Sequence, residues 1–370
     1  MGDGVSRLLQ RVQFGALSLR NRIVMAPMTR ERSPGGVPGP DVVEYYRRRA
    51  AGGVGMIITE GCAPDEIGAF GAAVPRFNDS SSSGWSTIVQ AVHEEGACIV
   101  PQLWHVGAFE PSMVGMTDTL SASKRQSPSG LASASVQIGS AMSQADIDAA
   151  IDAFASAATV AKQLGCDGIE LHGAHGYLLD QFFWSATNRR TDRYGGSLQQ
   201  RTRFAVELVQ ECRRRVGAGF PIILRFSQWK QLDYQARLFA SPDELGQFLS
   251  PLVDAGVDMF HCSTRRFWDP AFDEDATTLS GWTRRLSGRP TIAVGSVTLG
   301  NDFKSSDGKQ FAAIDSLAID RLEEFLARDE FDLIAVGRAL LANPDWVRTV
   351  AESGAEALRP FTREILDTLH

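Results

Sequence analysis

The chain has 370 residues, of which 44% are hydrophobic and 22% charged, and its formal net charge is -7. This composition is typical of a soluble globular protein that buries a large core. The acidic balance argues against a nucleic-acid partner, because that function needs clustered Lys and Arg side chains facing phosphates. No apolar run is long enough to cross a membrane, and five cysteines without a CxxC pair predict reduced thiols in a cytoplasmic protein, with no metal site.

The N-terminal part of the chain predicts a hairpin followed by a loop and a helix. Residues 12–23 alternate around a Gly and a polar centre, which predicts a β-hairpin able to plug the bottom of a barrel. Gly and Pro are dense in residues 33–40 and predict an irregular loop, after which Asp41 begins a helix that ends at Gly52.

The longest segment without periodicity is 107–141, which is rich in Ser, Gly and Met. In a compact domain such a segment is usually a lid or a binding loop. Ser143 and Asp146 then form a capping-box-like start to a helix with one apolar face.

Eight apolar segments alternate with helix-like segments along the whole chain. Continuous apolar strands separated by helices predict a parallel sheet covered by helices, and eight such units is the number that closes into a barrel. We therefore predict a single (β/α)8 TIM barrel domain over residues 1–370, with an N-terminal β-hairpin and long βα loops. A doubly wound nucleotide-binding fold is the rival, but the chain contains no GxGxxG or Walker sequence. The predicted strands are 23–28, 54–60, 98–105, 167–171, 221–226, 258–262, 290–295 and 332–337.

The segment 167–204 carries the main group of candidate catalytic side chains. His172, His175 and Tyr177 follow the apolar run of the fourth predicted strand, where a parallel barrel presents its chemistry. Two neutral imidazoles can each offer an N–H to one carbonyl oxygen, and a tyrosine with a pKa of about 10 stays protonated at neutral pH. These side chains predict a site that polarises a carbonyl group and donates a proton.

Two later strand ends predict a phosphate site. A phosphate-bearing cofactor on a barrel normally lies at the loops after strands seven and eight. Those loops begin with Gly295-Ser296 and Gly337-Arg338. Glycine lets the backbone N–H groups approach a phosphate, and arginine supplies a bidentate charge.

The motifs HGAHGYLLDQF (172–182) and TNRRTDRYGGS (187–197) resemble the signature of the Old Yellow Enzyme family. The resemblance implies an FMN-dependent ene-reductase that takes electrons from NADH or NADPH. Such an enzyme reduces the activated C=C bond of a small α,β-unsaturated carbonyl compound, an enone or enal, by a ping-pong hydride transfer. It further implies that His172 and His175 bind the carbonyl oxygen while hydride from the flavin reaches the β-carbon, and that Tyr177 protonates the α-carbon.

The same resemblance assigns residues to the cofactor and the substrate, with Trp104 as a substrate-pocket position. Departures from the family pattern at Ala108 and at residues 199–201 leave the substrate range and the subunit contacts open. The expected state is therefore either a monomer or a homo-oligomer. The cofactor-binding residues that it implies are Pro27, Met28, Thr29, Gly61, Gln102, Arg225, Gly295, Ser296, Gly337 and Arg338.

Two adjacent arginines, Arg265 and Arg266, follow the sixth predicted strand beside two aromatic residues. Arginine binds carboxylate or phosphate and stacks on aromatic rings, so Arg265 is predicted to bind substrate or the phosphates of the nicotinamide nucleotide. A surface salt-bridge cluster with Asp269, Asp273 and Glu274 is the alternative.

Other functions are also compatible with the sequence. The same flavin site could run as a desaturase or as a redox-neutral isomerase. A barrel hydrolase would use paired carboxylates, for which Glu60 and Glu170 near strand ends are the candidates. A flavin-binding carrier or sensor without turnover is a further alternative, against which the intact set of His172, His175 and Tyr177 argues.

Overall fold

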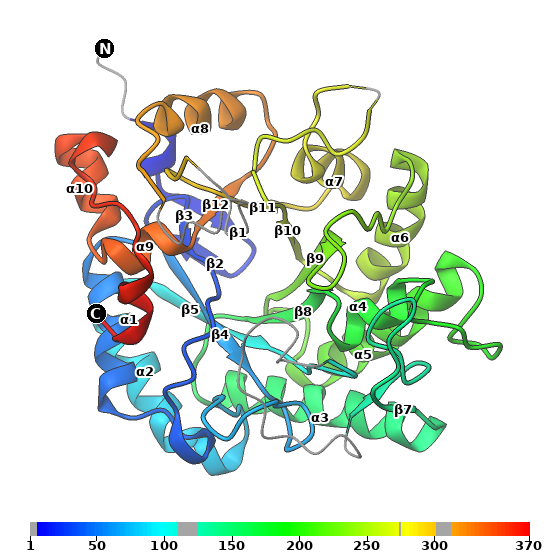
Figure 1. The fold of residues 1–370 in the computed structure, drawn as a ribbon. Coiled ribbons are helices and arrows are strands. Elements are labelled where there is room, and N and C mark those ends of the chain that lie inside the picture. Colours follow the sequence, from blue (N-terminus) through cyan, green and yellow to red (C-terminus); the bar gives the residue numbers. More distant parts are fainter. Residues whose placement is uncertain (1–5, 110–124, 274, 301–311) are drawn as a thin grey trace.

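The computed structural model describes residues 6–109, 125–273, 275–300 and 312–370. Eight parallel strands form a closed barrel in the order β10-β11-β12-β3-β4-β5-β8-β9, which confirms the predicted (β/α)8 fold (Figure 1). Each predicted strand is present, and its ends differ from the predicted ones by at most four residues. The barrel strands are β3 (Ile23–Met25), β4 (Met56–Cys62), β5 (Cys98–Leu103), β8 (Ile169–His175), β9 (Ile222–Lys230), β10 (Met259–Ser263), β11 (Thr291–Val294) and β12 (Leu333–Val336).

Helices surround the central strands (Figure 1). Several begin at side-chain caps. The cap of α3 is the one that the sequence predicts: Ser143 accepts from the Asp146 backbone N–H while Asp146 accepts from that of Ser143. The C-terminal segment, red in Figure 1, lies beside α1, because Arg49 donates to the His370 carbonyl oxygen. The helices are α1 (Pro40–Ala51), α2 (Ser82–Glu94), α3 (Gln144–Gln163), α4 (Leu178–Phe183), α5 (Leu198–Val216), α6 (Pro242–Ala255), α7 (Leu279–Ser287), α8 (Ala318–Ala327), α9 (Arg338–Ala342) and α10 (Trp346–Ser353).

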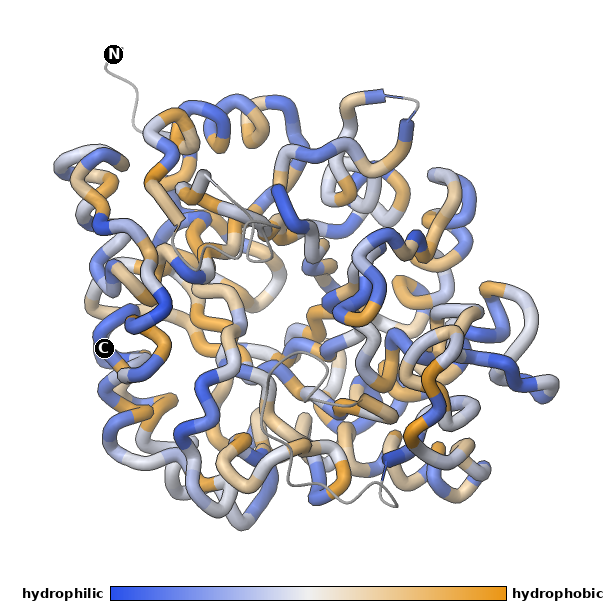
Figure 2. The backbone as a smooth tube through the Cα atoms, in the orientation of Figure 1, coloured by the Kyte–Doolittle hydropathy of each residue, from blue (hydrophilic) through white to orange (hydrophobic). Residues whose placement is uncertain are grey.

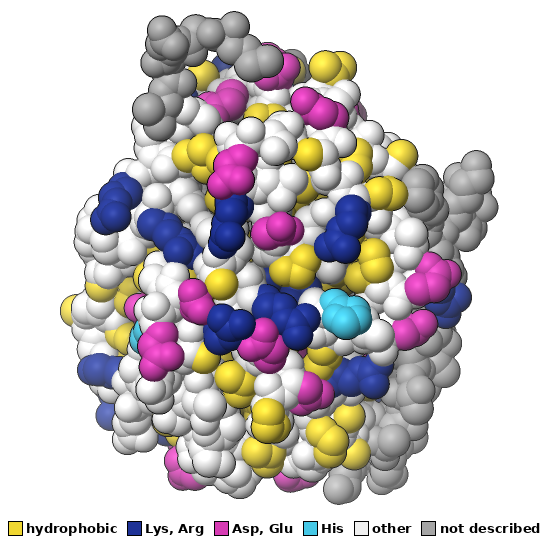
Figure 3. Space-filling model, turned by 90° about the vertical axis from the view of Figure 1, so that its left-hand side faces the viewer, with side chains coloured by type: hydrophobic (Ala, Val, Ile, Leu, Met, Phe, Trp, Pro, Cys, Tyr) yellow, Lys and Arg dark blue, Asp and Glu magenta, His cyan; other side chains and the backbone are white. Residues whose placement is uncertain are grey.

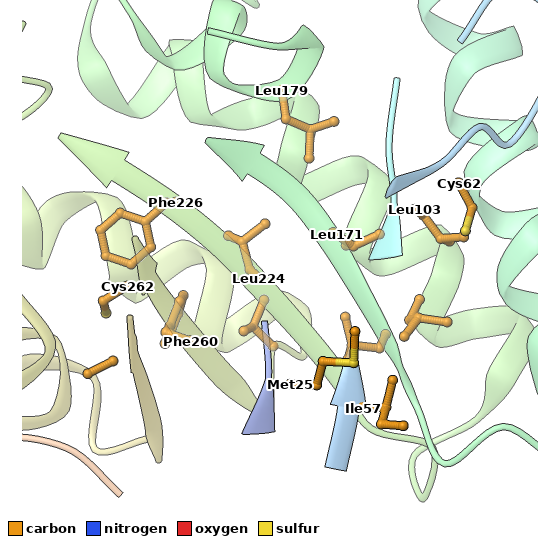
Figure 4. Close-up of a cluster of buried hydrophobic side chains, with 14 of the residues drawn as sticks. Met25, Ile57, Cys62, Leu103, Leu171, Leu179, Leu224, Phe226, Phe260 and Cys262 are labelled. Carbon is orange, nitrogen blue, oxygen red and sulfur yellow. The ribbon is translucent and has the colours of Figure 1, made fainter. Parts of the chain in front are cut away.

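Alternate residues of most barrel strands belong to two different cores. Leu171, Leu224 and Phe260 lie on neighbouring strands and pack with helix residues in the outer core, part of which is drawn in Figure 4. Val24 and Met56 instead belong to the inner core of the barrel. Full burial of such a side chain stabilises the fold by about 1.5–3 kcal/mol. Figure 2 shows the resulting pattern, with hydrophobic segments along the central strands and mixed hydropathy along the outer helices.

The predicted N-terminal hairpin is confirmed as β1 (Val12–Phe14) and β2 (Leu17–Leu19), which pair antiparallel. Leu17 and Leu19 are buried in the inner core together with barrel residues such as Met259. Met259 is at the first position of its strand, so the hairpin closes the N-terminal end of the barrel.

The inward-facing residues become polar towards the C-terminal ends of the strands. On β9, apolar Ile223 is followed by Arg225, and on β10, Met259 is followed by His261 and then Ser263. Side chains two apart on a strand share a face. The barrel interior is therefore apolar at the hairpin end and polar at the end where the functional site is expected.

Two strands extend further than the sequence predicts. β8 continues to His175, so His172 and His175 lie within a strand, and β9 continues to Lys230. The two ends pair His175 with Lys230 after a register shift. The predicted loop 107–141 contains the short strands β6 (Gln126–Ser127) and β7 (Ser140–Ala141), whereas residues 110–124 of that loop and 301–311 of the long segment after β11 lie outside the described residues.

The face in Figure 3 carries basic and acidic side chains interspersed, without one dominant sign. In the part of the chain that the structure describes, no helix combines the length and the apolar character that a membrane span needs.

Candidate active site

One pocket at the C-terminal end of the barrel collects every site residue that the sequence predicts. Its cavity volume is about 350 Å³, within the range of small-molecule sites. All eight strands, or the residues directly after them, contribute to the wall, because the carboxyl ends of parallel barrel strands meet at one rim. The predicted residues that line it are Pro27, Met28, Thr29, Gly61, Gln102, Trp104, His172, His175, Tyr177, Arg225, Arg265, Gly295, Ser296, Gly337 and Arg338.

His172 has a defined tautomer. Its Nδ1 atom accepts a hydrogen bond from the backbone N–H of Ala174 at 3.3 Å. Burial, and next the charge of Arg225, hold the pKa of His172 well below its usual range, so the imidazole is neutral. A neutral imidazole that accepts at Nδ1 carries its proton on Nε2. His172 therefore has an N–H donor available to the pocket that it lines.

His175 is held by two neighbours. Its Nε2 atom lies 2.7 Å from Ser263 Oγ, and its ring stacks on Trp229 with the centroids 4.4 Å apart. Burial, followed by the charge of Arg225, also lowers the pKa of His175 well below its usual range. The second histidine is thus neutral and oriented by the pocket wall.

Tyr177 stands beside the histidines at the start of α4. Its ring centroid is 5.0 Å from that of His172 and 4.9 Å from that of Trp104. Burial raises the pKa of Tyr177 above its ordinary value. The phenol therefore keeps its proton at neutral pH and can donate it.

A layer of buried polar side chains lies next to the histidines. Gln102 Nε2 donates to Glu170 Oε1 at 2.7 Å, and His261 Nδ1 lies 2.6 Å from Glu170 Oε2. Arg225 donates to Ser263 Oγ at 3.1 Å. Within the described residues its buried Nε finds no acceptor. Since an orphaned buried donor is costly, this layer is suited to a ligand that brings hydrogen-bond acceptors to Arg225.

At the predicted phosphate-binding end of the pocket, segments of the backbone lie very close to one another. Gly295 has φ 147°, and a side chain there would come within 2.7 Å of the Thr264 carbonyl oxygen. Ser296 adopts φ 49°, in the left-handed region, and its Oγ donates to the Arg265 carbonyl oxygen at 3.0 Å. Arg338 lies over the Phe361 ring, 5.6 Å from its centroid. Only glycine fits at position 295, which leaves the backbone of this loop open to the pocket.

The glycine at position 61 is explained by a steric constraint that does not involve a ligand. A Cβ at this position would collide with the ring of Trp104. The glycine therefore lets Trp104 pack flat against β4, where its ring forms part of the pocket wall.

The two carboxylates of the hydrolase alternative do not line this pocket. Glu60 Oε2 accepts from the backbone N–H groups of Arg30 and Glu31 at 2.8 and 3.1 Å. Glu170 is occupied by Gln102 and His261. Both carboxylates have internal structural partners, and this arrangement does not favour paired carboxylate catalysis.

Several lining residues were not predicted from the sequence. Ser263 is one residue beyond the predicted end of its strand, Trp229 lies in the extension of β9, and Gln231 directly follows that strand. Their polar or aromatic character next to strand ends was the available indication. Leu366 had none, because hydrogen bonds from Arg30 to the Leu366 and Thr368 carbonyl oxygens bring this remote segment to the pocket.

Arg265 lines the pocket and lies over the Tyr234 ring, 5.5 Å from its centroid, whereas Arg266 does not line it. Of the acidic residues in the alternative cluster, Glu274 lies outside the described residues. All five cysteines are free thiols, and the described residues contain no group of acidic, His and Cys side chains suited to a metal ion.

Comparison with known proteins gives consistent results. Residues 7–356 match the sequence model of the NADH:flavin oxidoreductase / NADH oxidase family. The putative 12-oxophytodienoate reductase 6 of Oryza sativa subsp. japonica is 33% identical over 335 residues, covering 89% of this chain and 79% of that protein. The NADH oxidase of Thermoanaerobacter brockii is 32% identical over 363 residues, and the match spans 95% of this chain but only 52% of that protein. The structure of morphinone reductase in complex with tetrahydroNAD superposes with a TM-score of 0.78 at 26% identity, covering 97% of this chain and 93% of that one.

Proposed function

The chain belongs to the NADH:flavin oxidoreductase / NADH oxidase family, in its Old Yellow Enzyme branch, and on this premise we propose that His172, His175 and Tyr177 form its reacting face. The protein is an FMN-dependent oxidoreductase that reduces activated C=C bonds with NADH or NADPH. Its residues therefore need to bind FMN, polarise a carbonyl group and deliver a proton.

The donor set of the pocket fits FMN. Among the described residues the buried Nε–H of Arg225 has no acceptor, and the pyrimidine edge of a flavin offers carbonyl oxygens and ring nitrogens. We assign Gln102 and Arg225 to that edge, with Thr29 beside them. FMN bound there would supply the hydride chemistry that links the nicotinamide nucleotide to the electron-poor alkene carbon. The further cofactor positions are Pro27, Met28 and Gly61 at the ring system and Gly295, Ser296, Gly337 and Arg338 at the phosphate.

His172 and His175 bind the carbonyl oxygen of the substrate. The Nε2–H of His172 supplies one donor, as its Nδ1 is already bonded to the backbone. His175 supplies the second from its oriented ring. Hydrogen-bond donors aimed at developing negative charge each contribute roughly a hundredfold or more to the rate. Because burial keeps both rings neutral, they polarise the carbonyl without transferring a proton to it.

Tyr177 gives the proton to the α-carbon. The observation that carries this assignment is its position, since its ring contacts His172 and Trp104 on one wall of the pocket. A carbonyl held by the histidines therefore places its conjugated carbons next to the phenol. Trp104 forms the flat side of the substrate space.

Arg265 binds an anionic group at the rim, either a nucleotide phosphate or an acid group on the substrate. Its place on the pocket wall beside Tyr234 supports this assignment. We further propose a cytoplasmic location, supported by the free thiols, and one FMN-binding domain over residues 1–370.

The proposed function is tested with the purified protein and a simple enone such as 2-cyclohexenone. The visible spectrum should contain the flavin bands, and NADH or NADPH should be consumed in a one-to-one ratio with the enone without oxygen. A colourless protein that fails to bind added FMN, or a yellow protein that leaves enones unreduced, would refute it.

A further inference from the structure

His175 adopts an unusual backbone conformation at the centre of the reacting face. Its φ is 68°, in the left-handed region. A residue with a Cβ occupies this region at a free-energy cost and stays there only when the surrounding structure enforces it. The direction of the His175 side chain depends on this conformation, since the Cβ is fixed by the backbone.

Hydrogen bonds hold the backbone on both sides of His175. Its N–H donates to Ser227 Oγ at 3.0 Å, and its carbonyl oxygen accepts from the Gln231 N–H at 3.1 Å. The next N–H, that of Gly176, donates to Asp180 Oδ2 at 2.7 Å. Hydrogen bonds therefore connect the turn between β8 and α4 to the extension of β9 and to the first turn of α4.

A buried ion pair connects the two elements, β9 and α4, that hold the backbone around His175. Lys230 Nζ lies 2.7 Å from Asp180 Oδ1, and the two side chains are 1% and 0% exposed. Lys230 also donates to the Ser227 carbonyl oxygen at 3.1 Å. The chain of contacts runs from Gly176 through Asp180 and Lys230 to Ser227 and back to His175, so it encloses the left-handed residue.

Stability alone gives little reason for such a pair. Desolvation of two charges offsets much of their attraction, and apolar residues of similar volume are often as stable at such places. The pair also constrains the surroundings of His175, because Asp180 accepts from the next backbone N–H, that of Gly176, and Lys230 donates to the carbonyl oxygen of Ser227, whose hydroxyl accepts from the His175 N–H. Neither side chain lines the pocket, so any effect on the reaction passes through His175.

We propose that Asp180 and Lys230 are positioning residues, which hold His175 so that its imidazole meets the substrate carbonyl. The proposal rests on the proposed role of His175. A ring displaced by about 1 Å can lose a hundredfold in rate. The pair thus keeps the strained turn in one conformation, so that the His175 imidazole is held as a hydrogen-bond donor to the substrate.

The test uses the FMN-loaded protein and the neutral double variant Asp180→Asn/Lys230→Met, alone and combined with His175→Ala. The matched control is Arg213→Met/Asp258→Asn, which removes an ion pair at the opposite end of the barrel. For each protein we measure the FMN content, the dissociation constant of p-hydroxybenzaldehyde, and the rate at which 2-cyclohexenone reoxidises the reduced protein.

We expect the double variant to retain FMN, bind the phenol about tenfold more weakly and reoxidise at least about tenfold more slowly than the parent. In the His175→Ala background the same change should reduce the affinity and the rate by less than about twofold, because the effects of substitutions in residues that act as one unit are not additive. The control should match the parent in both measurements.

The proposal would be overturned if the double variant had the parental affinity and reoxidation rate. It would also be overturned if the double variant reduced affinity and rate as much in the His175→Ala background as in the parent. If the double variant fails to bind FMN, Asp180→Asn alone replaces it, because its amide oxygen can still accept from the Gly176 N–H while the negative charge facing Lys230 is lost. Loss of FMN in that variant too, with the control intact, would make the pair purely structural. His175→Ala with parental rates would instead refute the proposed role of His175 and leave the pair's contacts unexplained by catalysis.

Discussion

The Nε2 atom of His175 lies 2.7 Å from the Oγ atom of Ser263. Ser263 also accepts a hydrogen bond from Arg225 at 3.1 Å, so one hydroxyl links the candidate carbonyl-binding histidine to the buried cation. Ser263→Ala should free the imidazole and remove an acceptor of Arg225. We expect phenol binding to weaken about tenfold, with FMN content retained.

A titration with p-hydroxybenzaldehyde followed by absorbance measures this effect. Ser287→Ala, which removes a hydroxyl on α7 bonded to the Thr283 carbonyl oxygen, is the matched control. Equal affinities in the parent and Ser263→Ala would show that Ser263 does not orient His175.

Tyr177→Phe keeps the ring contacts with Trp104 and Phe109 but removes the acidic proton. Alkene reduction should slow by about a hundredfold or more, as expected for loss of a general acid. Reduction of a quinone, which needs no proton at carbon, should persist. Steady-state rates with 2-cyclohexenone and with a quinone compare the two reactions, and equal losses in both would make Tyr177 a packing residue.

Arg265 and its neighbour Arg266 offer a matched comparison at the rim, because only Arg265 lines the pocket. If Arg265 binds an anion, Arg265→Ala should raise the KM for NADH, NADPH or an acidic enone about threefold to tenfold, and added salt should have a similar effect on the parent. Arg266→Ala should have a smaller effect. Unchanged KM values for every anionic partner in Arg265→Ala would assign the arginine to the surface salt-bridge cluster.

Glu60 predicts a pH dependence of folding stability. Burial is the largest cause that raises the pKa of its carboxyl to about 7, against the hydrogen bonds from Arg30 and Glu31 that lower it. An acid with a raised folded-state pKa stabilises the fold below its unfolded pKa, and this contribution is lost as the pH rises through the folded value. Between pH 4.5 and 8, Glu60 should therefore remove about 3 kcal/mol from the free energy of unfolding.

Urea unfolding at several pH values checks this for the parent and Glu60→Gln, whose neutral amide cannot titrate. The variant should show a shallower decline of stability from pH 4.5 to 8. Parallel curves for the two proteins would contradict the raised pKa.

The sequence predicted the strands well at their starts and less well at their ends. Apolar runs mark where a strand enters the barrel, but β8 and β9 continue through His175 and Lys230, whose polar side chains resemble a loop in the sequence. These extensions are stable because Asp180, Ser227 and Ser263 satisfy the polar groups. Pairing across β8 and β9 is a long-range property that no local pattern reports.

The site was predicted most fully where residues are adjacent to strand ends. His172, Arg225 and Gly337 all line the pocket for this reason. Leu366 could not be found in this way, since the hydrogen bonds of Arg30 place it. Glu60, a candidate only in the hydrolase alternative, shows the limit of this reasoning, because a carboxylate after a strand can cap a loop as easily as face a substrate, and only the position of the Arg30 and Glu31 N–H groups decides between them.

The most direct test of the central claim is the single-turnover rate at which 2-cyclohexenone reoxidises the reduced protein, followed by flavin absorbance. The parent, His172→Ala and His175→Ala are compared at matched FMN content. If the two imidazoles polarise the carbonyl, each substitution should slow this step by roughly a hundredfold, with reduction by NADH or NADPH affected less. Parental reoxidation rates in both variants would contradict the account.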